Sequence, residues 1–231
     1  MKKRIIVALD TDSPESAMAT VASLSGEVGL FKVGMELFPR GGPGLIGRIR
    51  DAGADVFLDL KFHDIPNTVA GAVRSAAALG VKLATVHASG GKAMLSAAAE
   101  AAAGTGTTIL AVTVLTSLDD ADLSSIGFSL PVKEAVERLA GLAMDAGIGG
   151  IVCSAKEVAA IRRRVGKNVV LVTPGVRLPE DSAGDQKRVV TPAEAIRAGA
   201  DYIVVGRPIT RAADPVAAAR KFAADMARAI R

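Results

Sequence analysis

The segment that decides the fold is Asp55–Ala88, which reads DVFLDLKFHDIPNTVAGAVRSAAALGVKLATVHA. It begins with a short apolar run, Asp55–Lys61, which predicts a buried strand. Pro66 opens an alanine-rich helical stretch that Gly80 ends, and a second apolar run, Leu83–Ala88, follows it. Strand, helix and strand in this order predict two parallel strands joined by a helical crossover.

The same alternation extends from this segment to both ends of the chain. The predicted strands are Arg4–Asp10, Leu30–Gly34, Asp55–Lys61, Leu83–Ala88, Thr107–Leu115, Gly150–Ser154, Val169–Gly175 and Tyr202–Gly206. The first predicted helix has Ser13 as its N-cap and Pro14 at its first position. The other predicted helices are Gly44–Ala52, Pro66–Leu79, Lys92–Ala103, Pro131–Ala146, Lys156–Arg164, Pro192–Ala198 and Asp214–Ile230. Because no linker or break in composition divides these eight units, we expect one domain over residues 1–231. The fold class is therefore α/β, with eight parallel strands closed into a single (β/α)8 TIM barrel.

Composition limits the classes of protein that remain. Half of the 231 residues are hydrophobic but only 3% are aromatic, so small and branched side chains must fill the core. The net charge of +4 includes no long basic block, which argues against nucleic-acid binding. No stretch approaches the roughly 20 apolar residues of a membrane span, and Asp10 interrupts the short run that a signal peptide would need. Cys153 is the single cysteine, so the sequence predicts a cytoplasmic protein without a disulfide.

Polar residues stand at the predicted strand ends, where barrels of this class assemble their active sites. In chain order they are Asp10, Lys32, Asp59, Lys61, Asp64, His87, Thr113, Thr116, Ser154, Arg177 and Arg207. Asp59 and Lys61 are two residues apart on a strand, so we expect both side chains on one face. With Lys32 from the neighbouring strand and Asp64, they predict an alternating row of charges. Such a row suits either a structural ion-pair network or catalysis.

A phosphate site is predicted after strands seven and eight. The segments Thr173–Arg177 and Val205–Ile209 each place an arginine shortly after a glycine. Gly175 and Gly206 could serve only as tight turns, but two such turns with arginines favour phosphate binding in this fold. The stretch Pro174–Arg188 lacks a helical pattern and predicts a long loop, which we expect to close over the site.

These residues resemble a known family. The run LDLKFHDIPNT at Leu58–Thr68 closely resembles the signature of the orotidine 5′-phosphate decarboxylases. Further matches, in the family's order, are VALD (7–10), FKVG (31–34), VHASGG (86–91), VTVLTS (112–117), VCSAKE (152–157), TPGVR (173–177), DQKR (185–188) and VGRPI (205–209). The resemblance implies a lyase that converts orotidine 5′-phosphate to uridine 5′-phosphate (UMP) in de novo pyrimidine biosynthesis, with no cofactor and no metal.

The resemblance also implies roles for individual residues. The implied catalytic residues are Lys61, Asp59, Lys32 and Asp64. Lys61 would protonate C6 of the pyrimidine, and Asp59 would lie beside the substrate carboxylate. The implied substrate-binding residues are Asp10 and Lys32 at the ribose, Thr116, Ser154 at the pyrimidine amide edge, and Arg177, Gln186, Gly206 and Arg207 at the phosphate. A homodimer is implied in which Asp64, Ile65 and Thr68 reach the site of the partner subunit.

Two other functions remain open at this point. A Mg²⁺-dependent sugar-phosphate lyase, of the hexulose-phosphate synthase or keto-gulonate-phosphate decarboxylase type, would use an acidic residue where this chain has Lys32. A barrel that binds nucleotide phosphates without catalysis would share the fold alone. We expect His63 to be structural or interfacial, His87 to lie behind the site, and Cys153 to be a buried, inert thiol. No role is assigned to the Asp119–Ser129 loop.

Overall fold

A computed structural model describes residues 1–179 and 190–229, and their strands form one closed barrel. The strands are β1 (Ile5–Ala8), β2 (Leu30–Gly34), β3 (Asp55–Phe62), β4 (Leu83–His87), β5 (Thr108–Val112), β6 (Gly150–Val152), β7 (Val170–Thr173) and β8 (Tyr202–Val205). Each pairs in parallel with the next, and β8 pairs with β1. The predicted (β/α)8 barrel is confirmed.

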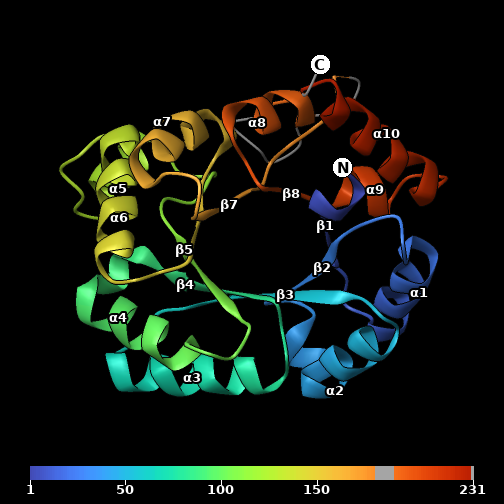
Figure 1. The fold of residues 1–231 in the computed structure, drawn as a ribbon, viewed down its shortest axis with the longest axis horizontal. Coiled ribbons are helices and arrows are strands. Elements are labelled where there is room, and N and C mark those ends of the chain that lie inside the picture. Colours follow the sequence, from blue (N-terminus) through green and yellow to red (C-terminus); the bar gives the residue numbers. More distant parts are fainter. Residues whose placement is uncertain (180–189, 230–231) are drawn as a thin grey trace.

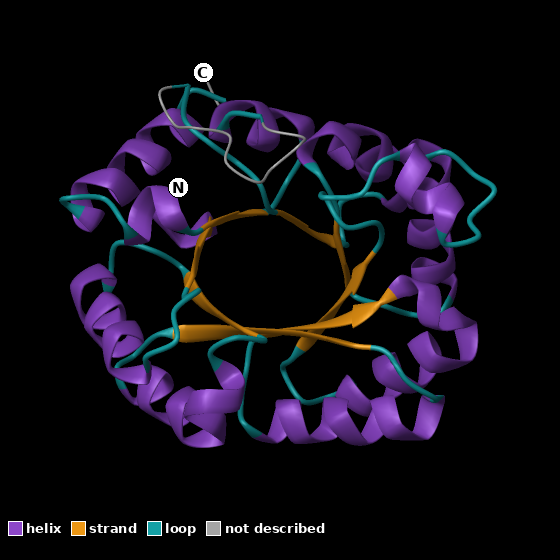
Figure 2. Ribbon diagram, turned by 180° about the vertical axis from the view of Figure 1, so that it is seen from behind, coloured by secondary structure: helices purple, strands orange, loops and turns teal. Residues whose placement is uncertain are grey.

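The helices form an outer ring around these strands (Figures 1 and 2). They are α1 (Pro14–Leu24), α2 (Phe38–Asp51), α3 (Pro66–Ala78), α4 (Gly91–Ala102), α5 (Asp120–Ser125), α6 (Val132–Asp145), α7 (Ala155–Val165), α8 (Pro192–Ala198), α9 (Arg207–Thr210) and α10 (Pro215–Ala227). Two short 3₁₀ helices, η1 (Lys2–Arg4) and η2 (Ala88–Gly90), precede β1 and α4. Among the helices of the described residues, none is both long and apolar enough to cross a membrane.

Strand residues alternate between two hydrophobic layers. Ile5 and Val7 belong to the larger cluster, which lies between the strands and the surrounding helices. Ile6 and Ala8 belong to a smaller cluster that fills the barrel with Phe57 and other strand residues. This separation follows from the two-residue period of a strand. The short, apolar strands of the sequence are thus buried on both faces, as parallel strands are in α/β proteins.

Local sequence signals explain where the helices begin. Ser13 precedes α1, and its side chain accepts a hydrogen bond from the backbone N–H of Ser16, with Pro14 at the first helical position. Ser154 caps α7, and the carboxylate of Glu157 accepts a bond from the Ser154 N–H in return. Such caps satisfy backbone N–H groups that lack a partner within the helix.

The structure corrects several predicted boundaries. Residues Asp120–Ser125, within the predicted Asp119–Ser129 loop, form α5, where Asp119 makes a capping box with Asp122. The predicted strand Thr107–Leu115 is too long, because β5 ends at Val112, opposite the ends of both neighbouring strands. The other predicted strands and helices recur with shifts of a few residues at their ends.

The predicted helix Gly44–Ala52 also begins too late. The helical segment α2 starts at Phe38 and continues through a kink at Gly42, where φ is 55°. The glycines and the proline of this segment suggest a loop, but glycine adopts this left-handed conformation at little cost. The kink therefore joins a preceding helical turn to the predicted helix.

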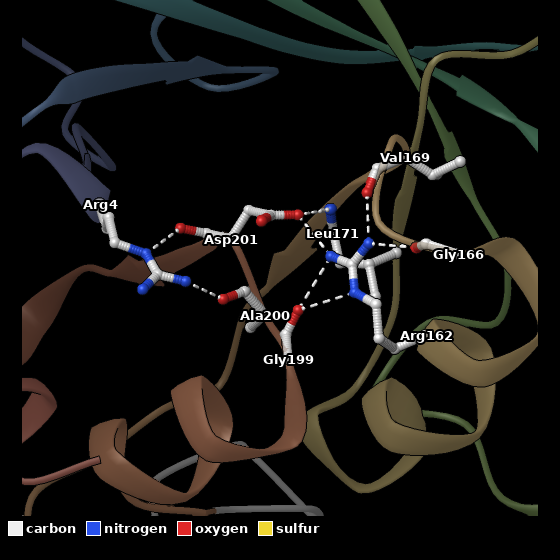
Figure 3. A network of polar contacts seen from close by, with 8 residues as sticks. All are labelled: Arg4, Arg162, Gly166, Val169, Leu171, Gly199, Ala200 and Asp201. Atoms are coloured by element: carbon white, nitrogen blue, oxygen red, sulfur yellow. Dashed lines mark hydrogen bonds and ion pairs between the residues drawn. The ribbon is translucent and has the colours of Figure 1, made fainter. Parts of the chain in front are cut away.

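A cluster of polar contacts joins the amino-terminal ends of β7 and β8 to helices α7 and α8 (Figure 3). Arg162 of α7 donates to the carbonyls of Gly166 at 2.6 Å, Val169 at 2.8 Å and Gly199 at 2.9 and 3.1 Å. It also donates to the Asp201 carboxylate at 2.6 Å. One guanidinium thus satisfies several backbone carbonyls at the end of the barrel opposite the predicted site.

Asp201 extends this cluster to the first strand. Its carboxylate accepts a bond from the N–H of Leu171 in β7 at 2.8 Å. Arg4, directly before β1, donates to the carbonyls of Asp201 and Ala200. The contacts therefore connect the start of β1 with the start of β8, where the barrel closes.

Replacing Arg162 by alanine should lower the free energy of unfolding by about 3 kcal/mol, because several carbonyls lose a charged donor together. Any activity of the site predicted at the strand carboxyl ends should remain unchanged at 25 °C, since the cluster is at the far end of the barrel. Urea unfolding measures the first quantity. Arg163→Ala is the matched control, because Arg163 is on the same helix and exposed. Equal stability of the two variants would contradict the role given to Arg162.

Candidate active site

Four charged side chains alternate in sign at the carboxyl ends of β1, β2 and β3. The Lys32 ammonium lies 3.0 Å from Oδ1 of Asp10 and 3.7 Å from Oδ2 of Asp59. The Lys61 ammonium lies 2.9 Å from Oδ1 of Asp59. Asp59 thus stands between two cations, and Lys32 between two carboxylates. The structure brings together three members of the predicted row and adds Asp10 to it.

The inner members of this row are largely shielded from water. The exposed fractions of the side chains are 12% for Lys32, 13% for Asp59 and 21% for Lys61, against 57% for Asp10. Charges placed in such surroundings must be paired, and their mutual attraction is screened less than at the surface. The row therefore holds an ammonium group in a fixed position at the mouth of the barrel.

Lys61 has an unusual backbone conformation. Its φ is 51°, and it is the one non-glycine residue with positive φ among those that the structure describes. This left-handed conformation costs a residue with a Cβ about 1–2 kcal/mol. The register of β3 against β4 shifts between Leu58 and Phe62, so Lys61 lies in a bulge. Strain of this kind is typical of functional sites.

Thr85 of β4 contacts this bulge, and the sequence analysis missed it. Its hydroxyl accepts a hydrogen bond from the Lys61 N–H at 2.9 Å and donates one to Oδ1 of Asp59 at 3.0 Å. A threonine inside a strand carries no signal of such a role. Only the shifted register of the two strands brings it opposite Asp59 and Lys61.

A cavity of about 180 Å³ opens above the inner part of the row. Lys32, Asp59 and Lys61 supply its charged groups, and Thr116 lies on its wall. The remaining lining is mostly apolar and consists of Phe57, Val112, Val114, Leu115, Val152, Cys153, Pro174 and Val204. An apolar pocket with a few converging polar groups is the usual form of a small-molecule site.

A second cavity, of about 420 Å³, adjoins the first and shares Lys32, Pro174 and Val204 with it. It is lined also by Ala8, Asp10, Glu36, Gly175, Arg177, Gly206, Arg207 and Arg211. Three arginines and a lysine face two carboxylates there, which favours an anionic ligand. Arg211 and Glu36 were not among the predicted residues, and Arg211 follows β8 only after the short helix α9.

Two glycines of this arrangement have structural reasons to be glycine. A Cβ at position 34 would lie 3.1 Å from the Lys32 ammonium, closer than ordinary packing allows. Gly175 has a φ of 75°, a conformation that glycine adopts at far lower cost than other residues. Gly175 is therefore favoured by its turn, whatever the cavity binds.

Arg177 lines the second cavity but is buried, and its guanidinium donates to the carbonyl of Val176 at 2.9 Å. Ser154 is fully buried, caps α7 and lines neither cavity. Gln186 lies outside the described residues, as does most of the predicted loop Pro174–Arg188.

The segment after Lys61 points away from the row of charged side chains. Asp64, Ile65 and Thr68 are all exposed, with Ile65 exposed by 67%. The Asp64 carboxylate accepts a bond from the Ile65 N–H at 2.7 Å, and none of the ion pairs within the described residues includes it. Among the described residues of this chain, the predicted row therefore stops at Lys61.

The two histidines lie beside the row and contact each other. The ring centroids of His63 and His87 are 5.5 Å apart. Burial lowers the pKa of His87, and the nearby His63 and Lys61 lower it further, while Asp59 acts in the opposite direction. Across residues 1–179 and 190–229, no three or more His, Cys, Asp or Glu side chains group as a metal ion would need.

Fold and site together define a (β/α)8-barrel enzyme that takes an anionic substrate at the carboxyl ends of its strands. A family model described as "Orotidine 5'-phosphate decarboxylase / HUMPS family" matches residues 3–222. The chain belongs to this family.

Individual relatives are similar over nearly the whole chain. Proteins named orotidine 5′-phosphate decarboxylase from Halorhodospira halophila and from an Anaeromyxobacter species are 55% and 56% identical, over 98% and 97% of this chain and 97% and 98% of theirs. The crystal structure of orotidine 5′-phosphate decarboxylase from Lactobacillus acidophilus superposes with a TM-score of 0.85 at 39% identity, covering 96% of this chain and 97% of that one.

The lowered pKa of His87 predicts how its imidazole titrates. In a proton NMR titration, the His87 ring should titrate below its ordinary value of 6.5, since burial and the neighbouring groups oppose the charged form. The unfolded chain then binds more protons below pH 6.5, so the unfolding free energy should fall as the pH drops through this window. His87→Gln should lose that part of the pH dependence.

The chain has only two histidines, so a His63→Gln variant assigns the remaining resonance to His87. A His87 midpoint at or above 6.5 would show that burial does not dominate its surroundings.

Proposed function

We propose that this protein decarboxylates orotidine 5′-phosphate to UMP in pyrimidine biosynthesis, with Lys61 as the proton donor. The observation that carries the proposal is the row from Asp10 to Lys61 at the floor of a cavity that continues into an arginine-lined one. Relatives at 55–56% identity bear the name of this activity.

The charge row matches the demand of the reaction. When the C6–carboxylate bond breaks, the electron pair remains on C6 in the plane of the ring and cannot delocalise into the carbonyls. A fixed cation stabilises this developing charge, and such preorganised electrostatics are usually the largest contribution to catalysis. The Lys61 ammonium, held 2.9 Å from Asp59, supplies the cation and then transfers a proton to C6.

The arginine-lined cavity suits the other end of the substrate. Arg177, Gly206 and Arg207 are proposed to bind the phosphate, together with Gln186, and Asp10 and Lys32 to bind the ribose hydroxyls. Arg211 adds a further cation to the same wall. Thr116 and Cys153 lie on the wall of the smaller cavity, and Ser154 directly follows Cys153 in the chain. Thr116 and Ser154 are proposed to lie near the pyrimidine. Binding energy from the phosphate end is then available to lower the barrier at C6.

Lys32 separates this proposal from the Mg²⁺-dependent alternative. Its ammonium occupies the space between the carboxylates of Asp10 and Asp59, where it opposes a second cation. A barrel that only binds phosphate would have no use for the strained backbone of Lys61, because Lys61 does not line the arginine-lined cavity.

A homodimer with shared sites is part of the proposal, and Asp64, Ile65 and Thr68 are its interface residues. The support is their exposure in one subunit and the separation of Asp64 from the charge row. We further propose that residues 1–231 act as one catalytic domain and that the protein works in the cytoplasm, where a lone thiol such as Cys153 stays reduced.

Lys61→Ala should reduce turnover by about 10⁴-fold or more, because it removes both the stabilising cation and the proton donor. The measurement is the loss of ultraviolet absorbance of orotidine 5′-phosphate in excess EDTA. Lys82→Ala is the matched control: Lys82 pairs with Asp55 at 2.7 Å at the other end of β3 and should be dispensable for turnover. If the parent protein leaves the absorbance unchanged, the proposal fails and Mg²⁺ with sugar phosphates becomes the next assay.

Shared sites predict complementation between two inactive variants. In a mixed dimer of Lys61→Ala and Asp64→Ala subunits, one site keeps its own Lys61 and receives the intact Asp64 of the other subunit. Random pairing of co-expressed subunits should therefore restore about a quarter of the parent activity, since half the dimers carry one intact site. Each variant expressed alone gives the baseline. Activity no higher than that baseline, or a fully active monomer in sedimentation, would rule out the contribution across the interface.

A further inference from the structure

The register between β3 and β4 leaves one residue of β4 facing the bulge. From the pair Leu58–Ala84 to the pair Phe62–Val86, β3 advances by four residues while β4 advances by two. Thr85 is the β4 residue between those pairs. It therefore stands alone opposite the part of β3 that contains Asp59 and Lys61.

The hydroxyl of Thr85 is engaged on both sides. Its oxygen accepts the Lys61 N–H at 2.9 Å, and its hydrogen is donated to Oδ1 of Asp59 at 3.0 Å. The direction is set by chemistry, because an ionised carboxylate only accepts and a backbone N–H only donates. A side chain with a hydroxyl at this position can serve both groups at once.

These bonds close a cycle around Lys61. Oδ1 of Asp59, which Thr85 contacts, is also the atom that lies 2.9 Å from the Lys61 ammonium. The cycle runs from the Lys61 backbone through Thr85 and Asp59 to the tip of the Lys61 side chain. Both ends of the lysine are thereby fixed relative to one hydroxyl.

Burial makes the hydroxyl hard to replace. Thr85 is 0% exposed, so its hydroxyl is shielded from water and is bonded to the Lys61 N–H and the Asp59 carboxylate. Thr85 is also not among the residues that line either cavity, so it acts on the reaction through Lys61 and Asp59. The left-handed backbone of Lys61, with φ of 51°, needs such outside support to persist.

We propose that Thr85 is a positioning residue: its hydroxyl holds Lys61 in the strained conformation and aims the ammonium group at the reacting carbon. This inference rests on the proposed role of Lys61 as proton donor. It adds a requirement on β4, a strand that otherwise supplies none of the charged groups of the row.

The test compares Thr85→Val, which keeps the shape but removes the hydroxyl, with Thr85→Ser, which keeps the hydroxyl. Thr85→Val should lower kcat about 10–100-fold with KM changed less than about threefold, because a displaced ammonium affects the chemical step and not phosphate binding. Thr85→Ser should return kcat to within about threefold of the parent, since both hydrogen bonds can re-form.

Thr107→Val is the matched control. Thr107 is a buried threonine directly before β5, and its hydroxyl donates to the carbonyl of Val81 at 2.6 Å, at the opposite end of the barrel. This variant should lose stability like Thr85→Val but keep kcat within about twofold, because the bond lies away from the strand carboxyl ends. If Thr85→Val does not fold, Thr85→Ala and Thr85→Ser replace the pair, as they differ only by the hydroxyl.

The outcomes separate this inference from the proposed function. A kcat of Thr85→Val close to the parent, or no difference between the serine and alanine variants, overturns the role of Thr85 while Lys61→Ala stays inactive. A Lys61→Ala variant that retains activity overturns the proposed function itself. A fall in kcat that Thr107→Val reproduces would mark both threonines as structural only.

Discussion

The pairing of β1 with β8 is the constraint on which the site depends. Ile5, Ile6 and Val7 pair with Ile203, Val204 and Val205, almost the full length of the chain away. This contact places Asp10, after β1, next to Gly206, where an added Cβ would lie 3.7 Å from the Asp10 carboxylate. An open sheet of the same strands would leave the charge row and the arginines at opposite edges. Closure therefore makes one continuous site from two halves of the chain.

The two ends of the barrel have different tasks. At the amino-terminal ends of β7 and β8, Arg162 and Asp201 bind backbone carbonyls and N–H groups and secure the strands. At the carboxyl ends, Lys32 and Asp59 are paired with other charged or polar groups of the site and face a cavity. This division is general in barrels, because the loops after the strands can change without loss of the strand ladder. Stability and chemistry are thus largely separate in this chain.

Within the site, an unfavourable backbone conformation accompanies an ammonium group that is held in a fixed position. Lys61 adopts an unfavourable backbone conformation, and its ammonium lies within hydrogen-bonding distance of Asp59. Neither feature would persist in an isolated strand, since the bulge needs β4 beside it and the carboxylate needs Lys32 on its other side. The surrounding barrel determines both. In the proposed reaction, such preorganisation would spare the reorientation of dipoles that water would require.

Much of this protein could be read from its sequence, because the deciding signals are local. Strand and helix periods, the Ser13 cap and the spacing of Asp59 and Lys61 depend on near neighbours in the chain, and they correctly predicted the barrel and the side of it that carries the charges. Spacing could not reveal Thr85, Arg211 or the position of Asp64 outside the charge row. Those depend on the register between strands, on the path of the chain after β8 and on which way a loop points. Only the closed tertiary structure decides them, because it alone sets the distances between residues far apart in the chain.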